Sequence, residues 1–208
     1  MDCCDELIDM VSVLGLGAPS AMMFDDGCEW AKTAIVVLPG MYEDWRVEQG
    51  VKLWPGSAKY LVVAGTRGDP SYTRQQIIGY AGTSLQNSNV ITGEFVEHTK
   101  AQMDWVCRVL QKQLTHVNCL IFTTAIYHVP RCVMTFLQAV ADCGLRNIVV
   151  VVEPLLGDLT SQQIASGLMS EAQKIRQYRQ KGDVLATDNL QAYFNWFKGG
   201  DVRWTEAG

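Results

Sequence analysis

Five short apolar runs constrain the fold more than any other feature of this chain. They cover residues 33–38, 59–64, 89–92, 118–124 and 147–152. The runs are continuous rather than alternating, which is typical of strands buried on both faces in parallel sheets. Helical patterns fill the intervals, so the sequence predicts βαβ units with right-handed crossovers. We therefore predict an α/β fold: a three-layer α/β/α sandwich with a Rossmann-like parallel sheet of about five strands, in the order 3-2-1-4-5.

Start and stop signals place helices between and outside these strands. Thr99 and Thr160 are each followed three residues later by Gln, a capping-box pattern that opens a helix. Gly144 and Gly182 follow the last apolar positions of two helical patterns, as glycines after helix ends commonly do. Further helices are predicted at 5–16, 44–54, 71–80, 129–143 and 189–198. In the first of these, Leu7, Ile8, Val11 and Leu14 share one face. No linker or repeat is evident, which predicts a single domain over residues 1–208.

Composition excludes several functional classes. The chain has 208 residues, of which 48% are hydrophobic and 19% charged, enough to build a core and too apolar for wholesale disorder. Its net charge of −5 gives no general basic surface, so nucleic acid is not an expected partner. No apolar run approaches the roughly 18 residues of a membrane helix, and the acidic start lacks the basic region of a secretory signal. We expect a cytoplasmic protein without a membrane partner.

The cysteines predict buried thiols rather than a metal site. There are seven, and none has CxxC spacing. Four lie in apolar stretches, at Cys107, Cys119, Cys132 and Cys143. Small apolar thiols of this kind are typical of a reducing compartment. No metal site is expected, because ligand spacing and partner histidines are missing.

The loops after the first and fourth runs carry polar residues that suit ligand binding. The first contains Gly40 and leads to Arg46; the second contains Thr124 and His128 and leads to Arg131. In an open parallel sheet, ligands bind beyond the carboxyl ends of the strands where the strand order reverses, here between strands one and four. Both arginines lie near helix starts, which attract anions. We predict one crevice in which the two arginines bind one anionic group.

His128 is the side chain best suited to acid/base chemistry near neutral pH. A helix start carries partial positive charge and disfavours the imidazolium form. We therefore predict that His128 faces the crevice and is mostly neutral without a ligand; the alternative is a purely structural histidine. His98 and His116 are expected to be ordinary surface groups, and Cys132 is expected to point into helix packing.

Three segments resemble the YdcF/SanA/ElyC-like domain family, a domain of unknown function. They are 35–40 followed by 46–50, 61–65, and 121–131, the last being similar to the family's strand-Thr-Ser-x-x-His-x-x-Arg signature. The resemblance covers residues 33–153 and leaves 1–32 and 154–208 as helical flanks. It implies a Rossmann-like sandwich that binds a nucleotide-like or phosphorylated small molecule, with S-adenosylmethionine as one option.

The resemblance also implies a set of ligand-binding residues at the carboxyl edge of the sheet. These are Gly40, Arg46, Gly65, Thr99, Thr124, His128 and Arg131. The sequence departs from the family where Ala101 and Gln102 replace a Glu-Asn pair. An activity that depends on that pair is not expected here.

Two further functional classes remain open beside the binding protein. One is a hydrolase or transferase that acts on a phosphorylated substrate, with His128 as the acid/base. A metal-dependent mechanism is disfavoured because paired carboxylates near the motifs are missing. The acidic residues Glu43, Asp44, Glu94 and Glu97 keep that alternative open. The other class is a non-catalytic interaction protein, suggested by the terminal helices and the Trp-rich C-terminal region.

Overall fold

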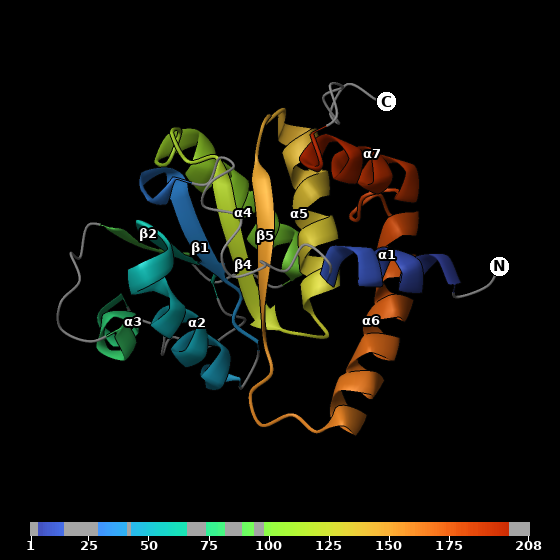
Figure 1. Ribbon diagram of the computed structural model, residues 1–208, viewed down its shortest axis with the longest axis horizontal. Coiled ribbons are helices and arrows are strands. Elements are labelled where there is room, and N and C mark those ends of the chain that lie inside the picture. The colour runs from blue at the N-terminus through green and yellow to red at the C-terminus, as the bar shows by residue number, and fades with distance from the viewer. Residues whose placement is uncertain are drawn as a thin grey trace.

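The sheet has the predicted order. The computed structural model describes residues 4–14, 29–40, 43–65, 74–81, 89–93 and 98–199. Within them, a short 3-10 helix η1 (Trp30–Lys32) precedes a parallel sheet with the strand order β3-β2-β1-β4-β5. The strands are β1 (Thr33–Val37), β2 (Tyr60–Val63), β3 (Val90–Thr92), β4 (Cys119–Ala125) and β5 (Val149–Leu155). The predicted α/β class and strand order are confirmed, and β1 and β4 lie side by side at the point where the order reverses (Figure 1).

One strand is longer than its apolar run. We predicted that the fifth run ends before Glu153 and Pro154, but β5 continues through both to Leu155. Pro154 is paired with Thr124 of β4. Because β5 is the edge strand, the missing N–H of a proline there breaks no sheet hydrogen bond on its outer side.

Helices cover both faces of the sheet. Helices α2 (Asp44–Ser57) and α3 (Arg74–Ala81) pack on one face, against residues such as Ile35 and Val37. Helices α4 (Thr99–Lys112) and α5 (Val129–Cys143) pack on the other, against Ala34, Val36 and Phe122. Alternate residues of β1 therefore face opposite layers, and β1 is fully buried. α2 extends to Ser57, three residues beyond the predicted end at residue 54.

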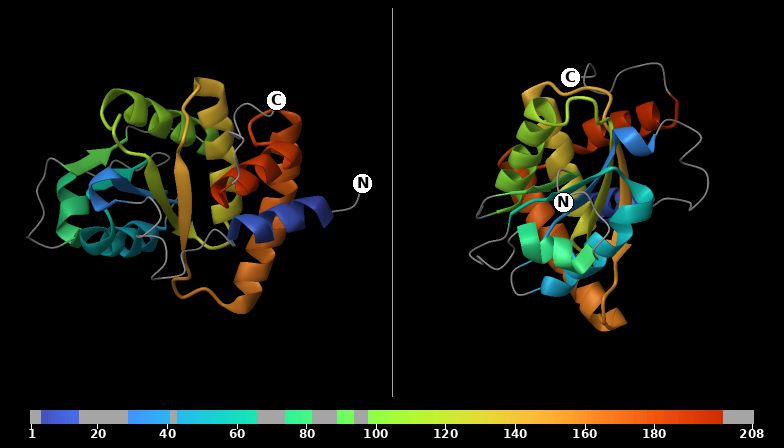
Figure 2. Two further views of the ribbon diagram at one scale, coloured as in Figure 1. Left: turned by 45° about the horizontal axis from the view of Figure 1, so that its top comes forward. Right: turned by 90° about the vertical axis from the view of Figure 1, so that its left-hand side faces the viewer.

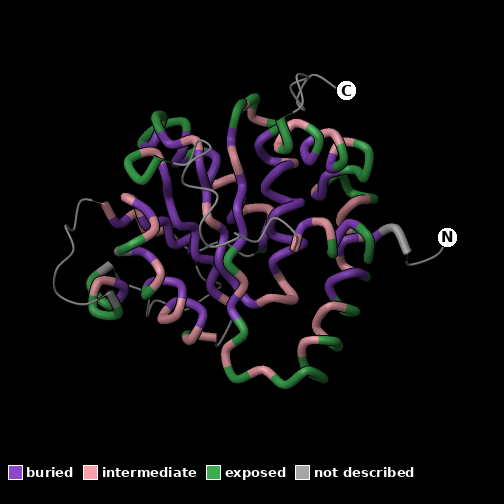
Figure 3. Tube along the Cα trace, viewed as in Figure 1, coloured by how far each residue is buried: buried purple, intermediate pink, exposed green. Residues whose placement is uncertain are grey.

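The flanking helices α1 (Cys4–Leu14), α6 (Ser161–Gln180) and α7 (Thr187–Phe197) lie together beyond α5 (Figures 1 and 2). The apolar face predicted for the first helix points outward: Ile8 is 62% and Val11 70% exposed. Buried and exposed positions alternate along α1 (Figure 3). Its buried face carries Met10 and Val13 in the core, together with two acids that pair with arginines of α6. The pairs are Glu6–Arg176, 3.1 Å, and Asp9–Arg179, 2.7 Å. None of the helices in the described part of the chain is long and apolar enough to cross a membrane.

Two of the four cysteines predicted to be buried thiols follow the prediction, whereas Cys143 is a free thiol that is only half-buried. Cys107 and Cys132 are buried free thiols, and burial raises the pKa of Cys132 to about 12. Cys132 thus lies inside the helix packing, as predicted, and is not a nucleophile at neutral pH. Cys119 differs, because it is disulfide-bonded.

Candidate functional site

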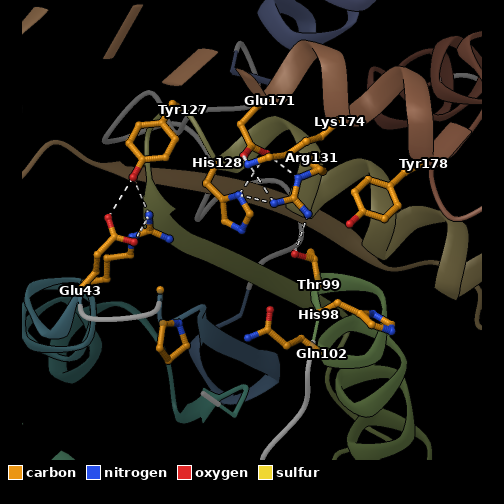
Figure 4. Close-up of a pocket in the computed structure, with 13 residues that line it drawn as sticks. Glu43, His98, Thr99, Gln102, Tyr127, His128, Arg131, Glu171, Lys174 and Tyr178 are labelled. Atoms are coloured by element: carbon orange, nitrogen blue, oxygen red, sulfur yellow. Dashed lines mark hydrogen bonds and ion pairs between the residues drawn. The ribbon is translucent and has the colours of Figure 1, made fainter. Parts of the chain in front are cut away.

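A polar pocket of about 400 Å³ lies at the carboxyl edge of the sheet, beside the ends of β1 and β4 (Figure 4). Its lining comprises Pro39, Gly40, Glu43, Arg46, His98, Thr99, Gln102, Tyr127, His128, Arg131, Glu171, Lys174 and Tyr178. The N-cap residues of α2, α4 and α5 are all among them: Glu43, His98 and His128. Glu171, Lys174 and Tyr178 come from α6, which forms the outer wall of the pocket.

Arg46 is the centre of a cluster at the end of β1. Its side chain is only 4% exposed, and Nη2 lies 2.6 Å from Glu43 Oε2. Nη1 donates to Thr124 Oγ1 at 3.2 Å, and Nη2 donates to the Tyr127 hydroxyl at 2.7 Å. That hydroxyl in turn donates to Glu43 Oε1 at 2.9 Å. Arg46 Nε is buried and has no hydrogen-bond partner among the residues that the structure describes, so this guanidinium keeps a donor that they do not use.

Gly40 gives the Arg46–Glu43 pair its space. A Cβ atom at residue 40 would lie 2.9 Å from Arg46 Cζ and would collide with the Glu43 carboxylate. The glycine is therefore needed for close packing of the ion pair against the loop that follows β1. A larger residue here would force Glu43 away from Arg46.

Arg131 is the centre of a second cluster, at the start of α5. Nε donates to Glu171 Oε2, and Nη1 donates to Thr99 Oγ1 at 2.7 Å. The Glu171 side chain is 3% exposed, and its Oε1 also accepts from Lys174 Nζ at 2.8 Å. Burial raises the pKa of Glu171, but the charge of Arg131 and its hydrogen bond outweigh it and hold the pKa well below its usual range. Glu171 is therefore a carboxylate at neutral pH.

His128 lies between the two clusters, with its ring pointing toward the middle of the pocket (Figure 4). Its Nδ1 is 3.2 Å from Glu171 Oε2 and 3.1 Å from Arg131 Nη2. Burial, with a contribution from Arg131, outweighs the opposing effect of Glu171 and lowers the pKa of His128 to about 4. This lowered pKa agrees with the prediction that His128 is mostly neutral without a ligand. The main cause is burial rather than the helix start that the sequence suggested.

Five of the seven predicted ligand-binding residues line this pocket: Gly40, Arg46, Thr99, His128 and Arg131. The other two support the lining from behind. Thr124 is fully buried and accepts from Arg46, and it donates to the Leu38 carbonyl at 3.0 Å. Gly65 follows β2, and its carbonyl accepts from Gln102 Nε2 at 2.7 Å.

The capping box predicted at the start of α4 is wrong, although the one predicted at Thr160 is present. The N-cap of α4 is His98, whose Nδ1 accepts from the Ala101 N–H at 3.2 Å. Gln102 does not cap the helix, because it donates to the carbonyls of residues 64 and 65 at the end of β2. This leaves the Thr99 hydroxyl available to Arg131. His98, expected to be an ordinary surface group, is exposed but lines the pocket.

The sequence analysis missed the contribution of α6 and of Tyr127. Glu171, Lys174 and Tyr178 lie in a flanking helix, far along the chain from the two arginine motifs. One signal was available: Glu171 is a carboxylate within the apolar stripe formed by Ile164, Leu168, Ala172 and Ile175. A charge on a buried helix face is rare unless it is paired, so the sequence could have predicted a cationic partner for Glu171.

The pocket has an excess of positive charge. Three cationic side chains line it, Arg46, Arg131 and Lys174, against two carboxylates, Glu43 and Glu171. The N-terminal ends of α2, α4 and α5 add partial positive charge. Among the residues that the structure describes, no group of three His, Cys, Asp or Glu side chains could hold a metal ion. Glu94 and Glu97, named as candidate acids, lie outside the described residues.

No family model, no curated protein and no solved structure matches this chain. The resemblance to the YdcF/SanA/ElyC-like family therefore stays a prediction from its three segments. The chemistry of the pocket itself carries the functional argument.

Proposed function

We propose that this protein binds a small phosphorylated molecule in the pocket at the carboxyl edge of the sheet. The observation that carries the proposal is the convergence of three helix N-termini and three cationic side chains on one pocket that has only two carboxylates. Backbone N–H groups at helix starts and cationic side chains together are the usual means of binding phosphate. The resemblance to YdcF-like proteins points to the same ligand class.

The remaining polar groups favour a phosphorylated molecule that also carries hydroxyl or amino groups. A carboxylate offers about four acceptor positions, so Glu43 can accept further bonds beside those from Arg46 and Tyr127. The volume of the pocket is within the range of small-ligand sites. A nucleotide or a sugar phosphate combines these features. S-adenosylmethionine fits the charge less well, because its sulfonium adds a positive charge to a pocket that already has an excess.

A second candidate function, hydrolysis or transfer of a phosphoryl group, is favoured by the contact between Glu171 and His128. A carboxylate beside one imidazole nitrogen is a common way to orient a histidine for acid/base work. This function needs an unprotonated Nε2 on His128 that can take a proton from a water or a hydroxyl group. Turnover of a phosphomonoester that disappears in His128→Gln would support it.

Calorimetric titration of the full chain tests the proposed binding. Inorganic phosphate, adenosine monophosphate and ribose 5-phosphate are compared with S-adenosylmethionine and unphosphorylated adenosine. Lys174→Met removes one cation from the pocket, and loss of a charge-assisted bond of about 1.5–3 kcal/mol lowers affinity at least about tenfold.

Lys52→Met is the matched control for this experiment. Lys52 also pairs with a glutamate on its own helix, Glu48 at 2.7 Å, but it lies outside the pocket lining. We expect it to bind phosphorylated compounds as the wild type does. Absence of binding by every phosphorylated compound, or equal losses in the two lysine variants, contradicts the proposal.

A further inference from the structure

Nδ1 of His128 has two polar neighbours, one that accepts hydrogen bonds and one that donates them. Glu171 Oε2, at 3.2 Å, can only accept a hydrogen bond, whereas Arg131 Nη2, at 3.1 Å, can only donate one. A neutral imidazole carries a single N–H, on one of its two nitrogens. Nδ1 therefore either donates to Glu171 or accepts from Arg131. The choice decides whether Nε2 faces the pocket as an acceptor or as a donor.

The bonds of Glu171 do not depend on His128. Glu171 Oε2 accepts from Arg131 Nε, and its Oε1 accepts from Lys174 Nζ at 2.8 Å. Both carboxylate oxygens are thus supplied by cations, and the charge of the carboxylate is balanced without a proton on Nδ1. A bare Nδ1 beside Oε2 costs little, because the oxygen's charge is already countered by the guanidinium.

The bonds of Arg131 do depend on His128. Its Nε and Nη1 are used by Glu171 and Thr99. For Nη2, the acceptor besides Nδ1 in the described structure is Glu171 Oε1 at 3.5 Å, the limit of a hydrogen bond. With a proton on Nδ1, two N–H groups would face each other at 3.1 Å around a guanidinium that is 8% exposed. Leaving a buried charged donor unpaired is costlier than leaving a satisfied carboxylate without a third donor.

We propose that His128 is held as the neutral tautomer with its proton on Nε2, and that it presents this N–H to the ligand as a hydrogen-bond donor. Arg131 is then a positioning residue: its guanidinium holds Nδ1 and Glu171 together and sets the tautomer, and it adds positive charge to the pocket without donating a hydrogen bond to the ligand. The statement about the ligand rests on the proposed function, whereas the tautomer belongs to the free protein. A donor at Nε2 suits an unprotonated phosphate oxygen. It does not suit general-base catalysis from the resting state.

The tautomer can be read directly from long-range ¹H–¹⁵N correlation spectra of the ¹⁵N-labelled full chain at pH 7. The signals of His128 are assigned by their loss in His128→Gln. We expect a protonated, pyrrole-type Nε2 and an unprotonated, pyridine-type Nδ1. A pyridine-type Nε2, or protons on both nitrogens, would overturn the proposal from the wild-type spectrum alone, so the test does not depend on any variant that fails to fold.

Two variants show whether Arg131 or Glu171 sets the tautomer of His128. Glu171→Gln leaves the Nε2–H tautomer unchanged if Arg131 sets it, and shifts the tautomer if Glu171 sets it. Arg131→Lys removes the guanidinium group that donates to Nδ1. Nδ1 is then free to donate to Glu171, and the fraction of His128 in the Nδ1–H form increases. A tautomer that follows Glu171 and ignores Arg131 would show that the assignment of the positioning residue is wrong.

Titration of the same sample with inorganic phosphate separates this inference from the proposed function. We expect the Nε2 signal to shift while the tautomer stays the same. Phosphate binding that leaves Nε2 unmoved would overturn the donor role of His128. If the free protein has the expected tautomer but phosphate does not bind and no phosphorylated compound is found to bind, the proposed function fails and the tautomer assignment stands.

Discussion

The two arginine clusters of the pocket begin from the same sequence pattern and end with different partners. Each arginine follows a buried strand by several residues and lies in the first turn of the next helix. Arg46 pairs with Glu43, three residues earlier on the chain, whose side chain is 28% exposed. Arg131 pairs with Glu171, forty residues later, whose side chain is 3% exposed. The Arg46 ion pair is local and exposed only on the side of its carboxylate, whereas the Arg131 ion pair is long-range and buried on both sides.

The difference shows that one motif can serve two structural purposes. The Arg46–Glu43 pair forms within one loop and the helix that follows it, and Arg46 is also held by neutral hydrogen-bond partners, Thr124 and Tyr127, at the end of β4. The Arg131 pair joins α6 to the start of α5, so it holds the outer wall of the pocket against the sheet domain. Because a buried charge without a partner is far costlier than an exposed one, the two pairs should respond very differently to the same substitutions.

The largest expected effect is on stability when each arginine is replaced by methionine. Arg131→Met leaves Glu171 buried without its main partner and should lower the free energy of unfolding by about 3–5 kcal/mol. Arg46→Met should cost less, about 1–3 kcal/mol, because Glu43 can turn toward water. Urea unfolding at pH 7 measures both. The double variant Arg131→Met with Glu171→Met should regain much of the loss, and equal losses in the two single variants would contradict the comparison.

The second prediction concerns pH, because only the Arg131 cluster contains a histidine. The folded-state pKa of His128 is lowered to about 4, below an ordinary value of about 6.5, so the unfolded chain binds a proton that the folded protein does not. Stability should therefore fall as pH falls from about 6.5 to about 4, by on the order of 3 kcal/mol. Below an ordinary carboxyl pKa of about 4.3, the depressed pKa of Glu171 adds a further loss.

Urea unfolding over a pH series checks this prediction. In His128→Gln, the part of the loss between pH 6.5 and 4 should disappear. His116→Gln, which changes an exposed histidine that contacts Tyr60, should keep the wild-type profile. If His128→Gln and the wild type lose the same stability over this interval, His128 is not held neutral by the fold.

The third prediction concerns the packing of α6 against Tyr127, which belongs to the Arg46 cluster. A Cβ at Gly167 of α6 would lie 2.6 Å from Cγ of Tyr127, whose hydroxyl bridges Arg46 and Glu43. Gly167→Ala should therefore force α6 outward, at a cost of about 1–3 kcal/mol that the better helix propensity of alanine, about 1 kcal/mol, only partly offsets.

Gly79→Ala is the control for this substitution. Gly79 lies in α3, and a Cβ there meets nothing within 4 Å, so the change should stabilise the protein by up to about 1 kcal/mol. Urea unfolding of both variants gives the comparison. A gain of similar size in Gly167→Ala would show that α6 has room to accept the methyl group.

The smallest expected difference comes from the hydroxyl groups that complete each cluster. Thr99→Val removes the acceptor of Arg131 Nη1, and Tyr127→Phe removes the hydroxyl that bridges Arg46 and Glu43. Each hydrogen bond contributes about 0.5–1.5 kcal/mol, and the loss should be larger at Thr99, beside the more deeply buried ion pair. Thermal or urea unfolding measures the stability lost in each variant. A larger loss of stability in Tyr127→Phe than in Thr99→Val would contradict this prediction.

Much of the site could be predicted because it depends on local patterns and one topological rule. Continuous apolar runs identified the strands, and the reversal of strand order placed the loops carrying Arg46 and Arg131 at one edge. Gly144 was correctly predicted to end α5, where it has a positive φ of 69° that suits glycine. These features follow from the backbone preferences and burial of neighbouring residues, which the sequence shows directly.

The partners of those residues were decided by the tertiary structure. The periodicity of α1 predicted an inner face that contains Ile8 and Val11, but the helix buries Met10 and Val13 together with Glu6 and Asp9, whose charges are paired with arginines of α6. In the same way, Glu171 enters the pocket only because α6 packs beside α5, a contact between segments that no local pattern relates.

The sequence by itself determined the sheet, its order and the position of the pocket, since short-range periodicity and chain connectivity are sufficient for these. The tertiary structure decided which charges are paired, which are buried and which nitrogen of His128 faces the pocket. The physical reason is that the energy of a charge depends on its distance to other charges and on its access to water, and both are set by elements far apart in the chain.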